Sequence, residues 1–364
     1  MKYISEFQNQ KVVHLLAQRI HEVVQDQKMT LMEVCGTHTM AIARFGIKSI
    51  LPEQLRLISG PGCPVCVTSI SYVDHAIELA KQPDVVITTF GDMMRVPGSV
   101  TNLEQERSRG AQVKIVTSTL DAISLAQSHP DKKVVFLGVG FETTIPTVGI
   151  AIQAAQEKQL QNFFVLSAHK IMPPAMRALC QGDIALDGFL CPGHVSTITG
   201  LSFYEQIVQD FNKGCVIAGF EPIDLLQGIL MLCQQIRLNE YKVENQYKRI
   251  VQTQGNPRAM SVINAVFESC DTEWRGLGDI PQSGLKIRSE YSHWDASVQF
   301  DVEIPPSNEP VGCRCGDVLT GKINPDECPL FGKTCTTDFP IGACMVSSEG
   351  SCAAAYRYRP VSVD

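Results

Sequence analysis

The sequence predicts an α/β protein with two parallel-sheet domains and a smaller cysteine-rich domain at its C-terminal end. Short apolar runs rich in β-branched residues alternate with segments of helical spacing, as in sheets built from βαβ units. From about Gln246 this alternation gives way to Gly, Pro and polar residues, and cysteines become dense toward the end. A length of 364 residues is enough for two or three domains. We therefore expect domains at 1–130, 131–245 and 246–364.

Seven runs are expected to form the strands of the two sheets, because each is short, apolar and bounded by Gly, Pro, Asp or Ser. They cover residues 55–59, 85–90, 113–117, 134–138, 163–167, 188–191 and 216–219. Segments 72–81 and 147–157 between them have helical spacing and few helix breakers. The strands could form one large sheet or two smaller ones. A weak internal similarity between Gly60-Pro-Gly-Cys63 and Cys191-Pro-Gly-His194 favours two sheets.

The composition excludes several classes of function. A hydrophobic content of 44% with 19% charged residues is ordinary for a globular protein. The net charge of −7 comes without a concentrated stripe of Lys and Arg, so no nucleic-acid partner is expected. The N-terminal segment does not have the pattern of a signal peptide, and no run approaches the roughly 18 apolar residues of a membrane span. We expect a cytoplasmic protein without a membrane partner. Disulfides are rare in that compartment, so the 14 cysteines indicate a metal or a redox cycle.

Four cysteines near the C-terminus have a spacing that favours an iron–sulfur cluster. They are Cys328, Cys335, Cys344 and Cys352. Structural zinc sites usually take their ligands from tight C-x2–4-C pairs, whereas six, eight and seven residues separate these cysteines. Loose spacing suits a 4Fe-4S cluster, whose corners can be reached by separate loops. Zinc and plain buried thiols stay open as alternatives, and Cys313-Arg-Cys315 just upstream could replace one or two of the ligands.

Cys63-Pro-Val-Cys66 is expected to form a redox-active dithiol. It follows the predicted strand 55–59 and precedes a helix that we expect to begin near Ser71, so backbone amides should face the thiols. A helix N-terminus favours the thiolate, and a C-x-x-C pair can close into a disulfide with little rearrangement. Half of a zinc site is the alternative, but the chain contains no second C-x-x-C pair to complete it.

Cys35-Gly-Thr-His38 places a thiol and an imidazole three residues apart, before a helix expected to start near Thr39. Both side chains can bind one iron or zinc ion, or the histidine can activate the cysteine as a nucleophile. On its own the pattern is weak, because a Cys and a His beside an apolar segment are more often packing residues.

Four further polar residues follow predicted strands, where open α/β sheets place their ligand crevice. Glu142 lies in Gly138-Val-Gly-Phe-Glu142, a turn that could hold an anion, and is a candidate acid or base. The turn lacks the complete glycine pattern of a dinucleotide site and the Lys-Ser/Thr of a P-loop. His169, His194 and Glu221 are the other three, and each could equally be a capping or hydrogen-bonded structural residue.

Together the motifs resemble the HypD family of NiFe hydrogenase maturation proteins, from about residue 30 to the C-terminus. They are Cys35-Gly-Thr-His38, Gly60-Pro-Gly-Cys-Pro-Val-Cys66, Gly140-Phe-Glu-Thr-Thr144, Cys328-Pro-Leu-Phe-Gly-Lys-Thr-Cys335 and Cys344-Met-Val-Ser-Ser-Glu-Gly-Ser-Cys352. The resemblance implies a scaffold that assembles the Fe(CN)2CO unit of the hydrogenase, with a HypC-like small chaperone and cyanide supplied by HypE/HypF-like partners. It also implies two α/β domains and a cluster domain.

The resemblance further implies a role for each group of cysteines. Cys35 would bind the iron of the nascent Fe(CN)2CO unit, with His38 beside it. Cys63 and Cys66 would be the redox dithiol, and Cys328, Cys335, Cys344 and Cys352 would bind the 4Fe-4S cluster. Keeping iron at low valence and releasing cyanide from a thiol carrier both require electrons, which a cluster feeding a dithiol can supply.

Two other functions fit parts of the pattern. A cluster-dependent protein disulfide reductase would use the tail cysteines and Cys63-Pro-Val-Cys66 without an iron cargo. A protein-interaction module held together by zinc would explain the four C-terminal cysteines but leave Cys63 and Cys66 without a role.

Overall fold

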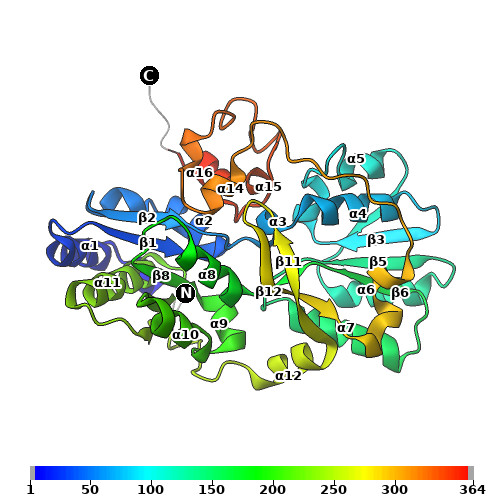
Figure 1. The fold of residues 1–364 in the computed structure, drawn as a ribbon, viewed down its shortest axis with the longest axis horizontal. Coiled ribbons are helices and arrows are strands. Elements are labelled where there is room, and N and C mark those ends of the chain that lie inside the picture. Colours follow the sequence, from blue (N-terminus) through cyan, green and yellow to red (C-terminus); the bar gives the residue numbers. More distant parts are fainter. Residues whose placement is uncertain (1–4, 360–364) are drawn as a thin grey trace.

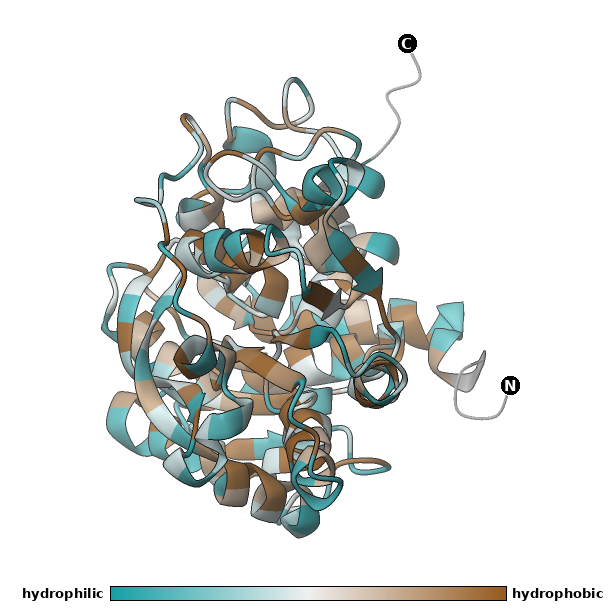
Figure 2. Ribbon diagram, turned by 90° about the vertical axis from the view of Figure 1, so that its right-hand side faces the viewer, coloured by the Kyte–Doolittle hydropathy of each residue, from teal (hydrophilic) through white to brown (hydrophobic). Residues whose placement is uncertain are grey.

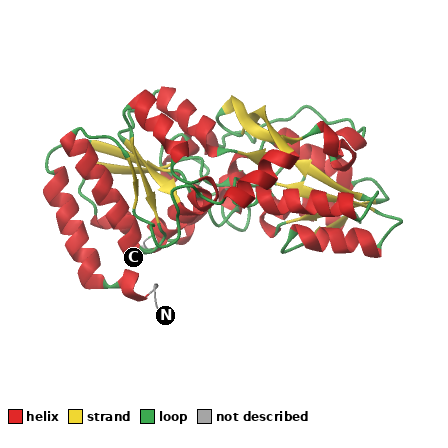
Figure 3. Cartoon of the chain, turned by 90° about the horizontal axis from the view of Figure 1, so that it is seen from below, coloured by secondary structure: helices red, strands yellow, loops and turns green. Residues whose placement is uncertain are grey.

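Two parallel sheets, one in each lobe, organise the computed structural model, which describes residues 5–359 (Figure 1). The first lobe has a five-stranded sheet in the order β10-β9-β8-β1-β2, and the second has a four-stranded sheet in the order β4-β3-β5-β6. Seen from below, each sheet has helices packed along its faces (Figure 3). The expected pair of parallel sheets is therefore confirmed.

The first lobe combines the beginning of the chain with residues from its middle. Its strands are β1 (Met29–Glu33), β2 (Leu55–Ser59), β8 (Gly188–Pro192), β9 (Gly214–Ala218) and β10 (Val243–Asn245). Its helical segments are η1 (Ser5–Gln8), α1 (Gln10–Val24), α2 (Gly36–Arg44), η2 (Ile47–Ile50), α8 (Met172–Gln181), α9 (Gly193–Thr199), α10 (Ser202–Phe211) and α11 (Pro222–Leu238). Strands β8 and β9 are buried along their whole length, as expected for central strands covered on both faces.

The second lobe is formed by the segment between those two parts. Its strands are β3 (Val85–Thr89), β4 (Gln112–Ile115), β5 (Lys133–Gly138) and β6 (Phe163–Ser167). Its helices are α3 (Pro64–Val67), α4 (Ile70–Ala80), η3 (Gly91–Arg95), α5 (Leu103–Ser108), α6 (Thr119–Ser128) and α7 (Ile145–Glu157). Helix α6 begins at a capping box of Ser118 and Asp121, and Ser69 caps α4 by accepting the N–H of Tyr72.

A small antiparallel sheet, in the order β11-β12-β7, lies between the lobes. It consists of β7 (His169–Lys170), β11 (Phe267–Trp274) and β12 (Gly278–Ile287), preceded by α12 (Pro257–Val266) and followed by η4 (Ser289–Trp294) and α13 (Ala296–Gln299). Residues 301–310 form no helix or strand and lead to the C-terminal segment from about residue 311, here called the tail. Only short helices form in the tail: α14 (Cys315–Leu319), η5 (Pro325–Glu327), α15 (Ala343–Val346) and α16 (Ser351–Arg357). In Figure 2 the hydrophobic segments concentrate toward the interior of the molecule.

The sheets do not follow the expected boundary between 1–130 and 131–245. Strand β1 pairs with both β2 and β8, so one sheet crosses that boundary, while β3 and β5 pair across it in the other sheet. The expected third part, 246–364, contributes the antiparallel sheet and the tail. Among residues 5–359, no helix is long and apolar enough to span a bilayer.

Candidate redox and metal site

The loops that follow β1 and β2 carry the two N-terminal cysteine motifs to one place. The two strands are parallel neighbours, so the segments after them leave the same edge of the sheet. The N–H of Gly36 donates to the carbonyl of Gly62 over 2.8 Å. A Cβ atom on Gly62 would lie 2.2 Å from the backbone nitrogen of Cys35. Only glycine permits this approach, which brings Cys35 beside the Cys63 loop.

Cys35 is the N-cap residue of α2, with 7% of its surface exposed. Helix α2 begins at Gly36, not near Thr39 as expected, so the backbone amides of His38 and Thr37 in its first turn lie near the thiol and favour its ionised form. Burial nevertheless raises the pKa of Cys35 to about 12. A metal ion could replace the thiol proton here, because the amide donors already favour a charged sulfur.

Glu33, which the sequence analysis did not single out, holds the loop before Cys35. It is 1% exposed, and one carboxyl oxygen accepts the N–H of Cys35 over 3.1 Å while the other accepts the hydroxyl of Thr39. Burial raises the pKa of Glu33 to about 7. The signal in the sequence was a carboxylate at the end of an apolar strand, directly before the motif.

The imidazole of His38 is fully buried, with one ring nitrogen free. Its Nε2 lies 3.2 Å from the carbonyl of Ala218 and 3.1 Å from that of Gly219. Carbonyls only accept, so Nε2 carries the hydrogen and Nδ1, which has no hydrogen-bond partner, presents its lone pair. Burial lowers the pKa of His38 to about 4. A neutral imidazole with a free nitrogen can act as a metal ligand or a base.

Cys63 and Cys66 are joined as a disulfide. Cys63 caps the short helix α3, and its sulfur accepts the N–H of Cys66 over 3.2 Å. The helix expected near Ser71 is α4, which begins one residue earlier, but α3 intervenes and directs its amides at the cysteines. The sulfur of Cys66 lies 3.9 Å from the carbonyl oxygen of Ala343, the residue before Cys344. The disulfide therefore abuts the tail.

The tail gathers five thiols, here called the tail thiol group: Cys313, Cys315, Cys335, Cys344 and Cys352. The Cys344 thiol lies close to those of Cys315 and Cys352, and the Cys313 thiol lies close to that of Cys315. The neighbouring thiols of Cys315 and Cys344 lower the pKa of Cys352. A Cβ atom on Gly342 would lie 2.5 Å from Cys315 Sγ and 2.6 Å from Cys313 Sγ, so the backbone lies directly against these sulfurs.

Cys328 takes no part in these thiol contacts among the described residues, although it belongs to the expected set. It begins the loop that ends at Cys335, where the N–H of Phe331 donates to the Cys328 carbonyl. Cys315, which was considered only as a replacement, contacts two members of that set. Among the described residues, no three His, Cys, Asp or Glu side chains stand in the arrangement of a bound metal ion.

Glu349 ties the tail to α2. Its carboxylate accepts the hydroxyl of Thr37 over 2.6 Å, and a Cβ atom on Gly36 would lie 2.5 Å from the Glu349 Cβ. Figure 1 shows α16 and α15 stacked above α2 and α3. Cys35, the disulfide and the tail thiol group thus meet in one region, although they lie far apart in the sequence.

The remaining candidates lie elsewhere or have structural roles. Glu221 caps α11 through a capping box with Asp224. His194 stacks on Phe220, with ring centroids 4.1 Å apart, and burial lowers its pKa. His169 is buried in β7, where its Nδ1 contacts Ser167 over 3.0 Å and its Nε2 has no partner.

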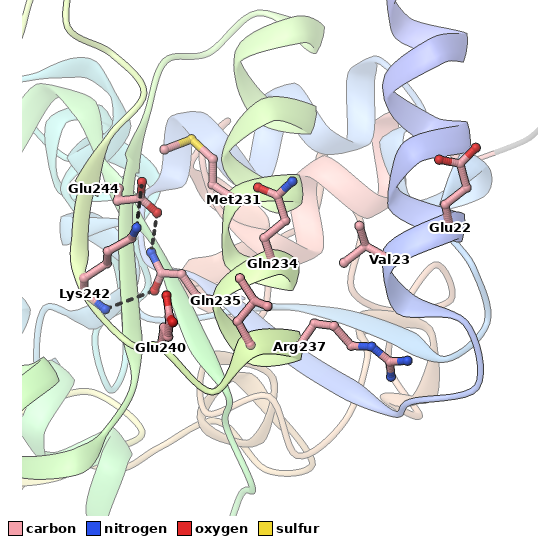
Figure 4. A pocket seen from close by; sticks show the side chains of 10 residues that line it. Glu22, Val23, Met231, Gln234, Gln235, Arg237, Glu240, Lys242 and Glu244 are labelled. Carbon is pink, nitrogen blue, oxygen red and sulfur yellow. Dashed lines mark hydrogen bonds and ion pairs between the residues drawn. The ribbon is translucent and has the colours of Figure 1, made fainter.

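Glu142 lines a cavity between the lobes that none of the cysteine motifs lines. A separate cavity of about 510 Å³ lies between α1 and the end of α11 (Figure 4). Three of its polar residues bond to one another, since Gln235 accepts the backbone N–H of Lys242 and donates to Glu244. Neither cavity belongs to the cysteine region.

Comparison with known proteins identifies the family. Residues 11–359 match the family described as "HypD: Hydrogenase formation hypA family". The chain belongs to the HypD family. The hydrogenase maturation factor HypD of Escherichia coli is 46% identical over 367 residues, which cover 99% of this chain and 98% of the relative. HypD of Azotobacter vinelandii is 45% identical over 367 residues, which cover 98% of this chain and 97% of the relative.

The similarity extends to archaea. A putative hydrogenase expression/formation protein of Methanocaldococcus jannaschii is 45% identical over 334 residues, which cover 92% of this chain and 93% of the relative. The resemblance to HypD expected from the cysteine motifs is therefore confirmed, and the chain is a hydrogenase maturation factor of that family.

Proposed function

We propose that this HypD protein is the scaffold and redox protein on which the Fe(CN)2CO unit of NiFe hydrogenase is assembled. A HypC-like chaperone would share the iron, and HypE/HypF-like partners would supply the cyanide. The observation that carries the proposal is the meeting of Cys35, the Cys63–Cys66 disulfide and the tail thiol group in one region. A scaffold that holds iron and also supplies electrons needs these three elements within reach of each other.

Cys35 and His38 are proposed to hold the iron cargo. A thiolate is a soft anionic ligand suited to iron that carries cyanide and carbon monoxide. The amides of His38 and Thr37 stabilise that thiolate, and burial keeps water and other ligands away. The free Nδ1 of His38 is the second candidate donor, because its Nε2 hydrogen is fixed by two carbonyls.

The tail thiol group is proposed to bind a 4Fe-4S cluster, which would supply single electrons when bound. An all-sulfur set of converging, mostly buried thiols fits such a group, and metal ligands commonly close around the metal as it binds. Cys335, Cys344 and Cys352 of the expected set lie in this group. Cys328 remains the expected fourth ligand, and its contacts make Cys315 the competing candidate.

Infrared spectroscopy of the chain co-expressed with its HypC-like partner and the cyanide donors tests the scaffold. Cys35→Ala should abolish the bands of iron-bound cyanide and carbon monoxide, yet keep the visible absorbance of the cluster, because no tail thiol is altered. Cys270→Ala, at a half-buried cysteine of β11, is the matched control and should keep both signals. Full cyanide and carbon monoxide bands in Cys35→Ala would refute the assignment.

The same variants separate the scaffold from a cluster-dependent protein disulfide reductase. A reductase needs the Cys63–Cys66 pair and electrons from the tail, but it has no use for Cys35. Reduction of a protein disulfide that survives in Cys35→Ala, in a chain that never acquires the infrared bands, would favour the reductase.

A further inference from the structure

Arg275 lies in the turn between β11 and β12, where this hairpin reaches the disulfide loop and the tail (Figure 1). Its backbone N–H donates over 2.9 Å to the carbonyl of Val67, at the end of α3. On the other side, a Cβ atom on Gly276 would lie 2.4 Å from the Cα of Gly316, next to Cys315. The turn is therefore held between the two groups of cysteines.

The guanidinium of Arg275 is a buried cation with too few partners. Its side chain is 1% exposed, and its Nε lies 3.2 Å from a carboxylate oxygen of Glu309. Both terminal nitrogens, Nη1 and Nη2, have no hydrogen-bond partner within the described part of the chain. A guanidinium keeps its charge in proteins, and buried N–H donors without acceptors cost stability. The surroundings of Arg275 therefore suit a second negative group.

Glu309 offsets the charge of Arg275 only in part. Its side chain is 57% exposed, and water weakens the field of an exposed carboxylate. The contact also uses only the Nε of the guanidinium, so the other N–H groups stay available.

The positive charge of Arg275 acts on the tail thiol group. The Cys315 thiol and burial raise the pKa of Cys313, whereas the charge of Arg275 works to lower it. Arg314 lies between these two cysteines in the sequence, but its side chain is 46% exposed and pairs with Asp317 over 2.8 Å. Of the two arginines, Arg275 is the one whose charge water does not screen.

A 4Fe-4S cluster bound by the tail thiols would be the missing negative group. Thiolate ligands give such a cluster a net negative charge, which grows when it accepts an electron, and net charge and hydrogen bonds to the sulfurs set its potential. A positive charge nearby favours the more negative, reduced form.

We propose that Arg275 is a positioning residue of the tail, whose guanidinium offsets the negative charge of the bound cluster and raises the potential at which the cluster is reduced. The inference rests on the proposed function, because it requires a cluster in the tail. Since the turn also contacts the end of α3, Arg275 helps to set which of the two neighbouring redox groups holds the electrons.

Redox titration of the anaerobic full chain, followed by the electron paramagnetic resonance signal of the reduced cluster, tests the proposal. Arg275→Met removes the charge from a long side chain, so it should lower the equilibrium constant for reduction at least tenfold, a shift of about 59 mV for one electron. Arg275→Lys keeps the charge, and its potential should lie closer to that of the unaltered protein. Arg314→Met, the matched control at the exposed arginine, should leave the potential unchanged.

Glu309→Gln tests the same charge from the opposite side and alters only an exposed residue, so its folding is not at risk. It removes the carboxylate that partly neutralises Arg275. The potential should therefore rise, in the direction opposite to that of Arg275→Met.

Iron and sulfide analysis of each protein separates this inference from the proposed function. An unaltered chain that holds no cluster would overturn both. A cluster whose potential is unchanged in Arg275→Met, or falls equally in Arg314→Met, would overturn the inference alone. If Arg275→Met holds no cluster, Glu309→Gln decides, and a potential that does not rise in that variant refutes the role of Arg275.

Discussion

At the scale of single residues, the site balances burial against specific hydrogen bonds. Burial disfavours the charged forms of Cys35 and Glu33 and raises the pKa of both, while nearby backbone amides favour the charged form of each. Such an arrangement keeps the thiol protonated until a metal replaces the proton. We therefore expect metal binding at Cys35 to release a proton.

The buried carboxyl of Glu142 should make the stability of the protein depend on pH. Burial raises its pKa from 4.5 to about 7, so the folded state holds a proton that the unfolded state loses. Its contribution to stability is complete below pH 4.5 and is lost as the pH rises through 7. The loss approaches about 3 kcal/mol at most. Urea unfolding at several pH values from 4.5 to 8 gives the free energy of unfolding of the unaltered chain and of Glu142→Gln. The difference between the two free energies should change by about 3 kcal/mol across this range.

Glutamine does not titrate, so the difference between the two curves isolates the carboxyl from the buried histidines. A difference that is constant across this pH range would show that Glu142 is ionised in the folded protein.

Cys335 is expected to be needed for the iron–sulfur cluster of the tail. Its sulfur accepts the N–H of Ile341 over 3.4 Å and lies close to Cys313 and Cys315. Anaerobically prepared protein should be brown with about four irons and four sulfides per chain, as a 4Fe-4S cluster requires. Cys335→Ala should lose the colour, and Cys270→Ala should keep it. A colourless unaltered protein with one zinc per chain would contradict the cluster.

At the scale of elements, close backbone contacts decide where the motifs lie. Gly62 sits against Cys35, and Gly350 sits against the Cys344 carbonyl, which a Cβ atom there would approach to 2.2 Å. Each glycine lets two segments that carry cysteines touch. Larger residues at these positions would push the segments apart.

Gly62→Ala tests this contact. The new methyl group would collide with backbone, which cannot rotate away, so we expect a loss of about 1–3 kcal/mol in the free energy of unfolding. Gly182→Ala is the control, because its Cβ would meet nothing nearer than 3.4 Å and its φ is −76°. Denaturant unfolding of both variants measures the effect. Equal stability of the two would mean that the Cys63 loop moves freely.

The sequence predicted these elements unevenly, for physical reasons. All seven expected strands are present, because each is a short run containing apolar residues with turn residues at its ends, although only Val113 of β4 is buried. Strand β1 was missed, since Thr30 and Glu33 interrupt its apolar pattern. Strands β7 and β10 have two and three residues, which is too short for a periodic signal.

The sequence named the candidate site residues but not the geometry that brings them together. Local spacing identified Cys35, Cys63 and Cys66, whose neighbours in the chain are also neighbours in space. The pairing of β1 with β8 and the docking of Glu349 on Thr37 depend on contacts between distant segments, which no local pattern encodes. The proximity of Cys315 to Cys344 and Cys352 was not predicted for the same reason, because these residues lie 29 and 37 positions further along the chain.

At the scale of the whole molecule, the tail depends on its neighbours for order. Its helices have five, four and seven residues, too few to be stable alone. We expect a bound cluster to order residues 313–335. Trypsin should cut the metal-free protein after the exposed Arg314, Lys322 and Lys333 faster than the loaded protein.

Mass spectrometry of the fragments measures these cuts. Lys286, exposed on the hydrogen-bonded strand β12, is the internal control and should be cut at the same rate in both forms. Equal cleavage of the tail with and without the cluster would show that the tail is ordered by protein contacts alone.

The interleaving of the two lobes also sets an order of events on the ribosome. Strand β2 ends at Ser59 and its sheet needs β8, which begins at Gly188, so about 130 residues must emerge before the first lobe can close. At about 5–20 residues per second this interval lasts roughly 6–25 s. During that time Cys35, Cys63 and Cys66 belong to an incomplete sheet, where the burial that protects them has not yet formed. A nascent chain paused before residue 188 should therefore expose these three thiols to alkylation, and one released after residue 245 should shield them.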